Sequence, residues 1–451
     1  LLASPLAMAQ SADEHFSGAA RVSDVDGNGY GDHAVVKYFP KRDKYFVYIT
    51  DGLSGNYIDR YSFGSDQVLD ILGLDDADGN KQREVAILRR DAKEKLRVRV
   101  RDAASGKDLS DAAIGGAAVT PQGMVALDDI SGNDADEYGV LMVDTKTGVS
   151  EVRLRDSKSG DFVNTVPAFD GQYRPQGLAT VPSLDLNDND ELAVLAVNKR
   201  NGQTRVRLVD SLTGQSINDV IFWSGADRSS KGFAVIADTN GNDAADIAVL
   251  YVKEKNKSVR VRVKDALTGE TLSDKAYFDK RYAALDIEAV KGIDGKSADG
   301  IAVMARRDNG DVRVLTRNAK SGKKLALSTY HDKRFAAEQL IQLADLDEDK
   351  VGDLGVLFTR KSRGTAWMRI RSPIDRNDII NTPVVGGDGN IPPIAVAGID
   401  EYVNRGAAAT VDGGDSFDPD SNNKLTYEWQ QVHGPDVTDK KGKLKGKRAL
   451  F

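Results

Sequence analysis

The chain contains no cysteine, which excludes disulfide bonds, thiol catalysis and cysteine-based zinc sites. Proline is sparse, with 12 residues in 451, whereas 43 glycines favour many tight turns over a disordered chain. No apolar stretch is long enough to span a membrane as a helix. The four histidines are scattered, and the sequence lacks the Gly-x-Ser-x-Gly, His-Glu-x-x-His and P-loop motifs. We therefore expect that the chain itself is not an enzyme.

Neither sign of charge dominates the composition. The 62 Lys and Arg against 69 Asp and Glu give a net charge of −7, which argues against nucleic-acid binding driven by net charge. Alternating runs at 96–100 (LRVRV) and 259–263 (VRVRV) have two interpretations. They are polyanion-binding strands, or solvated outer faces that balance acidic loops, and we favour the second. The arginines concerned are Arg97, Arg99, Arg101, Arg260 and Arg262.

The first nine residues form an apolar run that ends in Ala-x-Ala. Such a run is typical of the end of a secretory signal peptide, although a floppy apolar terminus is the alternative. We assign residues 1–9 to a signal-peptide remnant. The mature protein is then expected to be secreted, at the cell surface or in the periplasm, and export without cysteine favours a bacterial source.

An acidic, Asn/Gly-rich loop followed by a short apolar strand recurs seven times at intervals of 52 to 55 residues. An apolar run precedes each loop. After the loop and its apolar strand come a strand that alternates apolar and polar residues and an Asp-x-x-[Ser/Thr]-Gly turn. Glycine supplies the positive φ of this hairpin turn. The acidic loops begin at Asp24, Asp76, Asp129, Ser183, Asp238, Gly292 and Asp345. The turns begin at Asp51, Asp102, Asp156, Asp210, Asp265 and Asn318.

Each repeat therefore predicts four antiparallel strands, which is one propeller blade. Seven repeats predict an all-β fold, a seven-bladed β-propeller over residues 10–380, closed into a ring. The seventh repeat departs from the pattern because Ser372 to Asp375 replace the usual turn. We expect that its outer strand is irregular, or that residues near His15 and Phe16 complete the blade.

The loop-and-strand repeat resembles the FG-GAP and VCBS-type propeller repeats, whose relatives include the integrin α-subunit head. The resemblance covers residues 15 to 380 and rests on both the loop pattern and the interval. It implies a secreted binding or adhesion module of a larger extracellular protein. The expected partner is an extracellular protein or a carbohydrate rather than nucleic acid, and the chain is expected to be monomeric.

The acidic loops have the composition of calcium sites, because Ca²⁺ takes six to eight oxygen ligands and alternate residues of a tight loop can supply them. The first loop would use Asp24, Asp26, Asn28, the backbone carbonyl of Tyr30, and Asp32. The corresponding sets are Asp76, Asp78, Asn80 and Glu84 in the second loop; Asp129, Ser131, Asn133 and Glu137 in the third; and Asp185, Asn187 and Glu191 in the fourth. They are Asp238, Asn240, Asn242 and Asp246 in the fifth loop, and Asp345, Asp347, Asp349 and Asp353 in the seventh.

The alternative is that Asp, Asn and Gly simply make turns. We favour several structural calcium ions because gathered carboxylates without a counter-ion would repel one another. The prediction is strongest for the first, second, fifth and seventh loops; Ser131 is a poorer ligand, and Ser183 replaces a carboxylate in the fourth loop. In the sixth loop, with Gly292, Asp294, Lys296 and Gly300 at these positions, the ammonium group would repel a cation and we expect no metal.

Aromatic residues beside Arg and Asp recur in the connections between blades, at the face opposite the acidic loops. Rings flanked by charges are typical of surfaces that recognise sugars or proteins, but they would equally serve as wedges between neighbouring blades. The candidate ligand-binding residues are Phe169, Tyr173, Trp223, Phe278, Tyr282, Tyr330 and Phe335.

The C-terminal part differs in composition from the repeats. Residues 381–393 are rich in Gly and Pro and are predicted to be a linker. Residues 394–451 contain an Asp-Pro-Asp turn at 418–420 and Leu-Thr-Tyr-x-Trp at 425–429, which resemble the first half of a PKD-type immunoglobulin-like domain. We expect an incomplete β-sandwich with Trp429 in its core. Because PKD modules accompany depolymerases, the second functional interpretation is an accessory domain of a secreted polysaccharide-degrading enzyme.

Overall fold

The computed structural model describes residues 18–39, 43–185, 187, 189–293, 299–362 and 364–385, and short stretches at 410–413, 416, 425–430, 443–445 and 447–450. The described part contains strands and turns but no helix. No helix there is long and apolar enough to cross a membrane. Residues 1–17, which include the predicted signal remnant and His15 and Phe16, lie outside the described residues.

Twenty-eight strands form seven four-stranded sheets, and each sheet uses four consecutive strands of the chain. The first three sheets contain β1 (Gly18–Arg21), β2 (His33–Phe39), β3 (Lys44–Thr50) and β4 (Tyr57–Gly64); β5 (Gln67–Leu74), β6 (Glu84–Arg90), β7 (Leu96–Asp102) and β8 (Asp108–Gly115); and β9 (Val119–Leu127), β10 (Glu137–Asp144), β11 (Ser150–Asp156) and β12 (Phe162–Phe169). The fourth and fifth contain β13 (Tyr173–Val181), β14 (Glu191–Asn198), β15 (Thr204–Asp210) and β16 (Ser216–Trp223); and β17 (Arg228–Ile236), β18 (Asp246–Lys253), β19 (Ser258–Asp265) and β20 (Thr271–Phe278). The last two contain β21 (Tyr282–Val290), β22 (Gly300–Arg307), β23 (Val312–Asn318) and β24 (Lys324–His331); and β25 (Phe335–Gln342), β26 (Leu354–Arg360), β27 (Thr365–Arg371) and β28 (Asp378–Val385).

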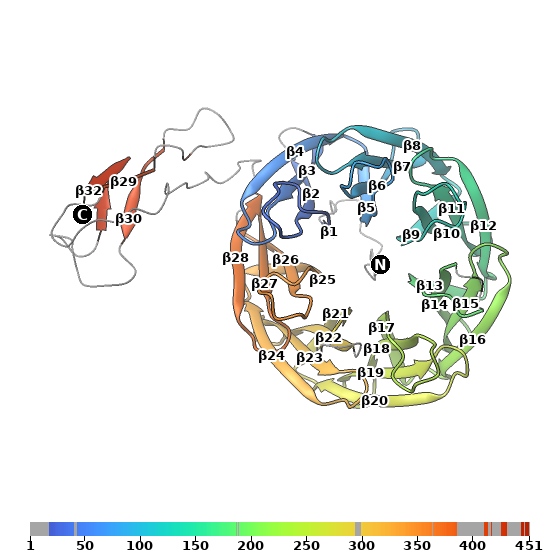
Figure 1. Cartoon of the computed structure of the whole chain (residues 1–451). Coiled ribbons are helices and arrows are strands. Elements are labelled where there is room, and N and C mark those ends of the chain that lie inside the picture. The colour runs from blue at the N-terminus through green and yellow to red at the C-terminus, as the bar shows by residue number, and fades with distance from the viewer. Residues whose placement is uncertain are drawn as a thin grey trace.

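The seven sheets stand as blades around a central axis, with the first strand of each blade innermost and the fourth at the rim (Figure 1). All neighbouring strands within a blade are antiparallel. The inner strands contact one another around the ring, and β1 meets β25 where the ring closes. The chain is a seven-bladed β-propeller. This confirms the predicted fold class.

Alternation of side chains explains how each strand is placed. The third strand of a blade alternates buried and half-buried residues, as in β7 and β11, because one face packs on the neighbouring blade and the other carries arginines. The second strand is almost wholly buried, as in β6 and β14. It lies within its own sheet and between two neighbouring blades, and it therefore reads as a continuous apolar run.

The core consists of seven hydrophobic clusters, and each cluster combines side chains from two adjacent blades. The cluster that joins the last blade to the first contains Val35 and Tyr48 from blade 1 and Leu357 and Met368 from blade 7. Ring closure therefore buries the same kind of apolar interface as every other junction, which leaves no exposed end blade.

The hairpin turns between third and fourth strands have the predicted left-handed glycine. In the first blade Gly55 has φ 71° and donates its N–H to the Asp51 carbonyl at 2.8 Å. In the seventh blade Arg376 occupies this position with φ 72°, and the turn still closes through the Ser372 N–H and the Asn377 carbonyl at 3.2 Å. The outer strand β28 is therefore regular and belongs to the blade's own chain, so the expected irregularity is wrong.

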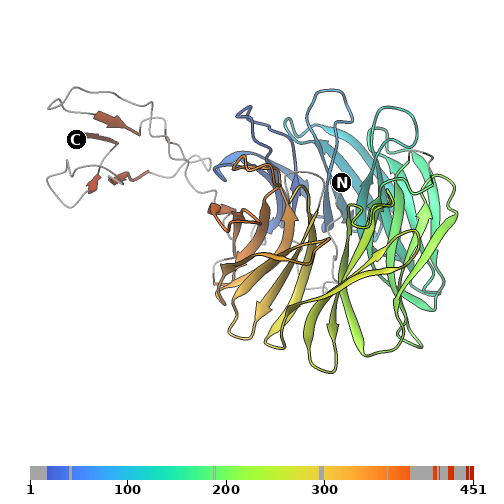
Figure 2. The same ribbon diagram turned by 60° about the horizontal axis from the view of Figure 1, so that its bottom comes forward.

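Two ends of the ring follow from this topology (Figure 2). The acidic loops join first to second strands, and the Ser/Thr-Gly turns join third to fourth strands, so both lie at one end, which we call the acidic end. The hairpins between second and third strands and the connections between blades lie at the other end, which we call the hairpin end.

The C-terminal boundary of the propeller lies later than predicted. Strand β28 continues to Val385, into the range assigned to the linker. Beyond it the described strands are β29 (Thr410–Asp412), β30 (Glu428–Gln430), β31 (Lys443–Lys445) and β32 (Arg448–Leu450), which form the pairs β29–β32 and β30–β31. Trp429 lies in β30 and is half-buried. A PKD-type sandwich stays a prediction, and residues 386–409 lie outside the described residues.

Candidate metal centres in the acidic loops

In six of the seven acidic loops the ninth residue is a buried acid at or just before the start of the second strand, and in the sixth loop it is Gly300. In the second loop one Glu84 carboxylate oxygen accepts the Ala77 N–H at 3.0 Å, while Oε1 is buried without any hydrogen-bond partner. The Glu84 side chain is 0% exposed. The same division, one oxygen bonded to the backbone and one orphaned, recurs at Glu137, Glu191, Asp246 and Asp353.

A buried orphan carboxylate oxygen is costly, because it has lost water and gained nothing in exchange. The sequence places three other oxygen-bearing side chains, at the first, third and fifth positions, in the same loop as this oxygen. A hard divalent cation is the ligand whose chemistry matches such a set. The residues present therefore fit a calcium ion.

The pKa values of these carboxyl groups are raised. Burial raises the pKa of Glu84 to about 8, and the neighbouring Asp76 and Asp78 carboxylates act in the same direction, against the Ala77 hydrogen bond. Burial likewise raises the pKa of Asp353 to about 8 and that of Glu137 to about 7. Without a cation these groups tend to hold a proton near neutral pH, so proton and metal compete for the same oxygens.

The first residue of the loop organises the backbone. Asp76 accepts the N–H groups of Gly79 and Lys81 at 2.7 Å each, and that of Asn80 at 3.1 Å. Asp129 accepts the corresponding N–H groups of Gly132, Asn133 and Asp134, and Asp238 accepts those of Asn240, Gly241 and Asp243. The first Asp therefore sets the local fold of the loop, as expected if Asp, Asn and Gly simply make turns. That interpretation does not explain the orphaned oxygen of the ninth residue.

Among the described residues, three loops bring three carboxylates together with ligand atoms within 4.8 Å of one another. They are Asp24, Asp26 and Asp32; Asp76, Asp78 and Glu84; and Asp345, Asp347 and Asp353. These are three of the four loops for which the prediction is strongest. In the fifth loop Asn240 and Asn242 take the intermediate positions, and in the third loop Ser131 and Asn133 do so.

The first loop differs at its ninth residue. Asp32 bonds both oxygens to the backbone, accepting the Val25 N–H at 2.7 Å and the Gly52 N–H at 2.9 Å. Burial raises the pKa of Asp32 to about 7. Tyr30 sends its hydroxyl to Glu348 of the seventh loop at 2.8 Å, which links the two loops across the ring closure.

The fourth and sixth loops are only partly described. In the fourth loop Asp185, Asn187 and Glu191 are in place, and the Ser183 hydroxyl is buried without a partner, but Leu186 and Asp188 lie outside the described residues. In the sixth loop residues 294–298, including Asp294 and Lys296, lie outside them. The expectation that the sixth loop holds no metal stays a prediction.

In blades 1 to 5 a second acid from the same blade reaches the loop, and sequence reasoning missed it. The loop Asn donates its side-chain N–H to the first Asp of the following turn: Asn80 to Asp102 at 2.7 Å and Asn133 to Asp156 at 2.8 Å. Asn28, Asn187 and Asn242 reach Asp51, Asp210 and Asp265 in the same way. The turn Asp was read only as a turn former, although its spacing of 26 or 27 residues from the loop start already placed the two elements at one end of the blade.

The candidate aromatic residues are mostly buried. Phe169, Trp223, Phe278, Tyr330 and Phe335 are between 1% and 7% exposed and belong to the clusters between blades, so they pack as wedges. Tyr173 and Tyr282 are half-buried, and Arg205 and Arg313 lie over their rings at 4.9 and 6.0 Å. The structure therefore leaves five of these seven rings inaccessible to a ligand.

The arginines of the third strands are not solvated outer faces, which corrects the expectation from the sequence. Arg262 contacts Asp274 at 2.7 Å and donates to the Phe222 carbonyl of the preceding blade, also at 2.7 Å. Arg97 and Arg99 converge on Asp111 at 2.9 Å in the same way. The sequence did not predict these pairs because Arg and Asp lie on different strands, and the register between strands cannot be read from a single sequence.

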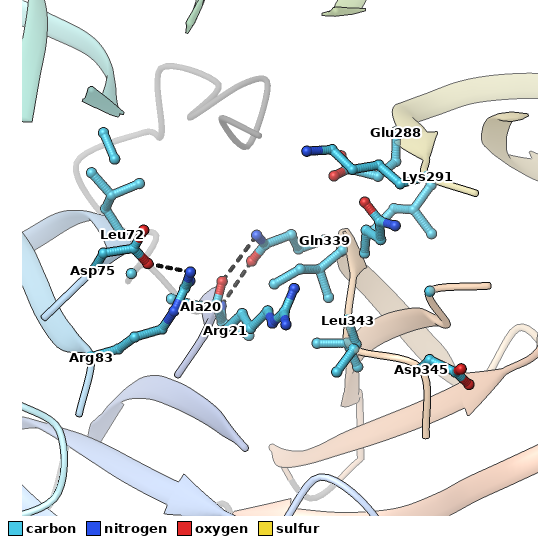
Figure 3. Close-up of a pocket in the computed structure, with 18 of the residues that line it drawn as sticks. Ala20, Arg21, Leu72, Asp75, Arg83, Glu288, Lys291, Gln339, Leu343 and Asp345 are labelled. Carbon is cyan, nitrogen blue, oxygen red and sulfur yellow. Dashed lines mark hydrogen bonds and ion pairs between the residues drawn. The ribbon is translucent and has the colours of Figure 1, made fainter. Parts of the chain in front are cut away.

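A cavity of about 610 Å³ lies at the acidic end of the ring, lined by the ends of inner strands (Figure 3). Arg21 of blade 1 and Lys291 and Glu288 of blade 6 lie around it, and Arg83 pairs with Asp75. The Gln339 side chain bonds the Ala19 N–H at 2.8 Å and the Ala19 carbonyl at 3.1 Å, which closes the ring beside the cavity. Its mixed lining of acids and bases does not select one ligand charge.

Comparison with protein-family models gives no match, and comparison with curated proteins gives none either. Solved structures do match. The chain is similar to BBS1N, solved in complex with ARL6DN, at 13% identity and a TM-score of 0.53 over 84% of this chain and 99% of that chain. The likeness shows the fold alone.

Two further matches are to enzymes. A prolyl endopeptidase structure is 17% identical with a TM-score of 0.49, over 89% of this chain and 55% of that one. A europium-containing methanol dehydrogenase is 11% identical with a TM-score of 0.43, over 86% of this chain and 81% of that one. At these scores neither match carries an argument about function.

Proposed function

We propose that the chain is a calcium-stabilised β-propeller that serves as a binding or adhesion module of a larger extracellular protein, with a protein or glycan ligand. The observation that carries the calcium is the orphaned, buried carboxylate oxygen at the ninth position of five loops. The binding role is supported by the fold, because propellers present many loops on a rigid ring and BBS1N was solved with a protein partner. Fold alone does not select the ligand.

The calcium ions would act as structural ligands in this proposal. Each would be held by Asp, Asn and the ninth carboxylate, and would join the connection between the inner two strands to the body of the blade. Extracellular modules of this kind bind calcium at about 10⁻⁴ to 10⁻³ M, which suits an ion supplied from outside the cell. Each occupied site would add about 1 to 3 kcal/mol to the free energy of unfolding at calcium well above its dissociation constant.

The calcium part is tested by thermal melts and calorimetric titration of the whole chain, with Glu84→Gln as the probe. Glutamine keeps the shape of the side chain but loses the charge that faces the loop. We expect calcium to raise the melting temperature of the wild type, chelation to reverse this, and Glu84→Gln to bind one calcium fewer. Glu270→Gln is the matched control, because Glu270 is exposed in the turn between β19 and β20 of the fifth blade, away from the second loop. A melting temperature indifferent to calcium, with magnesium equally without effect, contradicts the proposal.

The binding part is tested by a glycan array and a pull-down from extracellular matrix material, each with and without chelator. A ligand retained only with calcium supports the module. The second candidate, an accessory domain of a secreted polysaccharide-degrading enzyme, rests on the PKD-like motifs at 418–429. It predicts that the ligand found is the polysaccharide cleaved by the parent protein.

A further inference from the structure

The hairpin end of blades 4 to 7 is positively charged although the whole chain is acidic. Its eight connections carry 15 Lys and Arg but only 7 Asp and Glu, while the net charge of the chain is −7. The acidic loops lie at the opposite end of the same blades, so charge is separated along the axis of the ring. The connections are 170–174, 198–203, 224–228, 253–258, 279–282, 306–311, 332–335 and 360–362.

Backbone hydrogen bonds hold these connections together in pairs. In each blade the entering connection bonds the hairpin between the second and third strands: Lys199 N–H to the Gln172 carbonyl at 2.8 Å in blade 4, and Lys361 N–H to the Arg334 carbonyl at 3.0 Å in blade 7. Blades 5 and 6 repeat the contact at 2.8 Å. Because blades 4 to 7 are neighbours packed through shared clusters, the pairs form one continuous arc (Figures 1 and 2).

Several of these cations have no acid to neutralise them. Lys255, Lys280, Lys333 and Lys361 are exposed, and none forms an ion pair with the described residues. A fixed row of unpaired cations attracts an extended polyanion, and does so more strongly at low salt.

The chemistry around the cations selects among polyanions. Exposed Asp279 and half-buried Asp332 stand between the lysines, each paired with an arginine two residues on. A carboxylate accepts hydrogen bonds from sugar hydroxyls, whereas it repels a dense phosphate chain. Nucleic-acid recognition on such a surface would use exposed rings for base stacking or a helix for the major groove. Five of the candidate rings at this end are buried, and the described part of the chain has no helix.

We propose that the hairpin end of blades 4 to 7 binds linear acidic polysaccharides, with lysines contacting the acidic groups and Asp279 and Asp332 accepting sugar hydroxyls. This inference rests on the proposed function as a binding module and names the face and the ligand class. It needs no calcium in direct contact with the ligand, because the metal loops lie at the other end.

The test measures binding of the calcium-loaded chain to hyaluronate, a linear polysaccharide with a carboxylate in each disaccharide, with neutral dextran as the reference. The probe variant is Lys280→Gln, Lys333→Gln and Lys361→Gln combined. The matched control is Lys107→Gln, Lys158→Gln and Lys320→Gln, which removes the same charge from exposed lysines at the acidic end. Both variants change only exposed side chains, and melting temperatures verify that both are folded.

We expect the wild type and the control to bind hyaluronate with an affinity that falls as salt rises, and the probe variant to bind about tenfold more weakly. Equal affinities of probe and control overturn the inference, as does tighter binding to duplex DNA or to phosphatidylglycerol vesicles than to hyaluronate. Absence of hyaluronate binding in the wild type overturns it too. A calcium-dependent ligand found on the array with no effect of the probe variant would leave the proposed function standing and remove this face from it.

Discussion

Single carboxylates do two different jobs in this ring. The ninth residue of five acidic loops has an oxygen that the protein itself leaves unsatisfied, whereas Asp70 and Asp286 on the inner strands use both oxygens. Asp70 accepts the N–H of Ile71 at 2.9 Å and that of Met124 in the next blade at 3.0 Å. Asp286 bonds Ile287 and Leu340 in the same arrangement. Both are 6% exposed, so they tie neighbouring blades together from within the core.

These two tie residues make stability depend on pH. Burial raises the pKa of Asp70 and of Asp286 to about 7, against the backbone hydrogen bonds, while an unfolded Asp titrates near about 3.9. The folded state therefore holds more protons between these values, and stability falls as pH rises from about 4 to 7. The free energy of unfolding of the wild type should therefore fall between pH 5 and 8. We expect Asp70→Asn combined with Asp286→Asn to make this fall smaller by on the order of 2 kcal/mol per carboxylate.

Urea denaturation at saturating calcium measures this slope without a contribution from empty metal loops. Asp59→Asn with Asp161→Asn is the control, because both residues are exposed. It should retain the slope of the wild type. An unchanged slope in the Asp70 and Asp286 variant would show that these carboxyl groups titrate alike in the folded and unfolded states.

The acidic loops show how far residue-level prediction reaches. Oxygen-bearing residues at alternate positions were readable from the sequence, because local spacing alone decides which side chains a nine-residue loop can gather. The burial of Glu84 and its orphaned oxygen were not readable, because they depend on the neighbouring strands. The turn Asp102 joins the loop through Asn80 only after the third strand folds back along the second.

At the scale of strands, alternation predicted four-stranded blades and left the contacts between them open. The run 96–100 correctly gave a strand with two unlike faces. Its arginine face was assigned to solvent, but Arg101 donates to the Ser62 carbonyl of the preceding blade at 2.7 Å and lies over Phe63 at 4.7 Å. A strand pattern shows which side chains share a face and does not show what that face meets.

The third-strand arginines therefore stabilise the contacts between blades, and Arg262 offers a test. Arg262 bonds Asp274, donates to the Phe222 carbonyl, and lies 5.9 Å from the centres of the Trp223 and Tyr251 rings. Arg262→Gln leaves the carbonyl and part of the carboxylate unsatisfied in a half-buried site. We expect a loss of about 2 kcal/mol in the free energy of unfolding.

Chemical denaturation of the calcium-loaded chain measures this loss. Arg281→Gln is the control, because Arg281 pairs only with exposed Asp279 among the described residues, and surface pairs contribute about 0 to 1 kcal/mol. If both variants lost the same small amount, the arginines between blades would be no more than surface charges.

For the whole molecule, the number of repeats in the sequence predicted that the ring closes. It did not predict which contacts close it. Each blade, including the first and the seventh, is built from its own four consecutive strands, so no strand is exchanged to lock the ring. Closure depends on side chains instead: the cluster around Val35 and Leu357, the Tyr30–Glu348 hydrogen bond, and Gln339 on the Ala19 backbone. These partners are more than 300 residues apart, which is beyond what local patterns reveal.

Gln339 makes the closing junction testable apart from the other six. Its amide satisfies both the N–H and the carbonyl of Ala19, at 2.8 and 3.1 Å, on the short first strand. Gln339→Ala removes both bonds, and at about 1 kcal/mol for each hydrogen bond we expect a loss of about 2 kcal/mol. Because opening begins where the ring is weakest, amide exchange in β1 and β25 should quicken before that of other inner strands.

The internal comparison is Gln176→Ala, since Gln176 accepts a hydrogen bond from Ser230 at the junction of blades 4 and 5. Blades 4 and 5 are consecutive in the chain, so the covalent connection between them opposes local opening at this junction. Hydrogen exchange with mass spectrometry should show faster exchange at β13 and β17 alone in this variant, with β1 and β25 unchanged. Uniform acceleration around the ring in both variants would mean that the propeller opens as one cooperative unit and that its closing junction is no weaker than the rest.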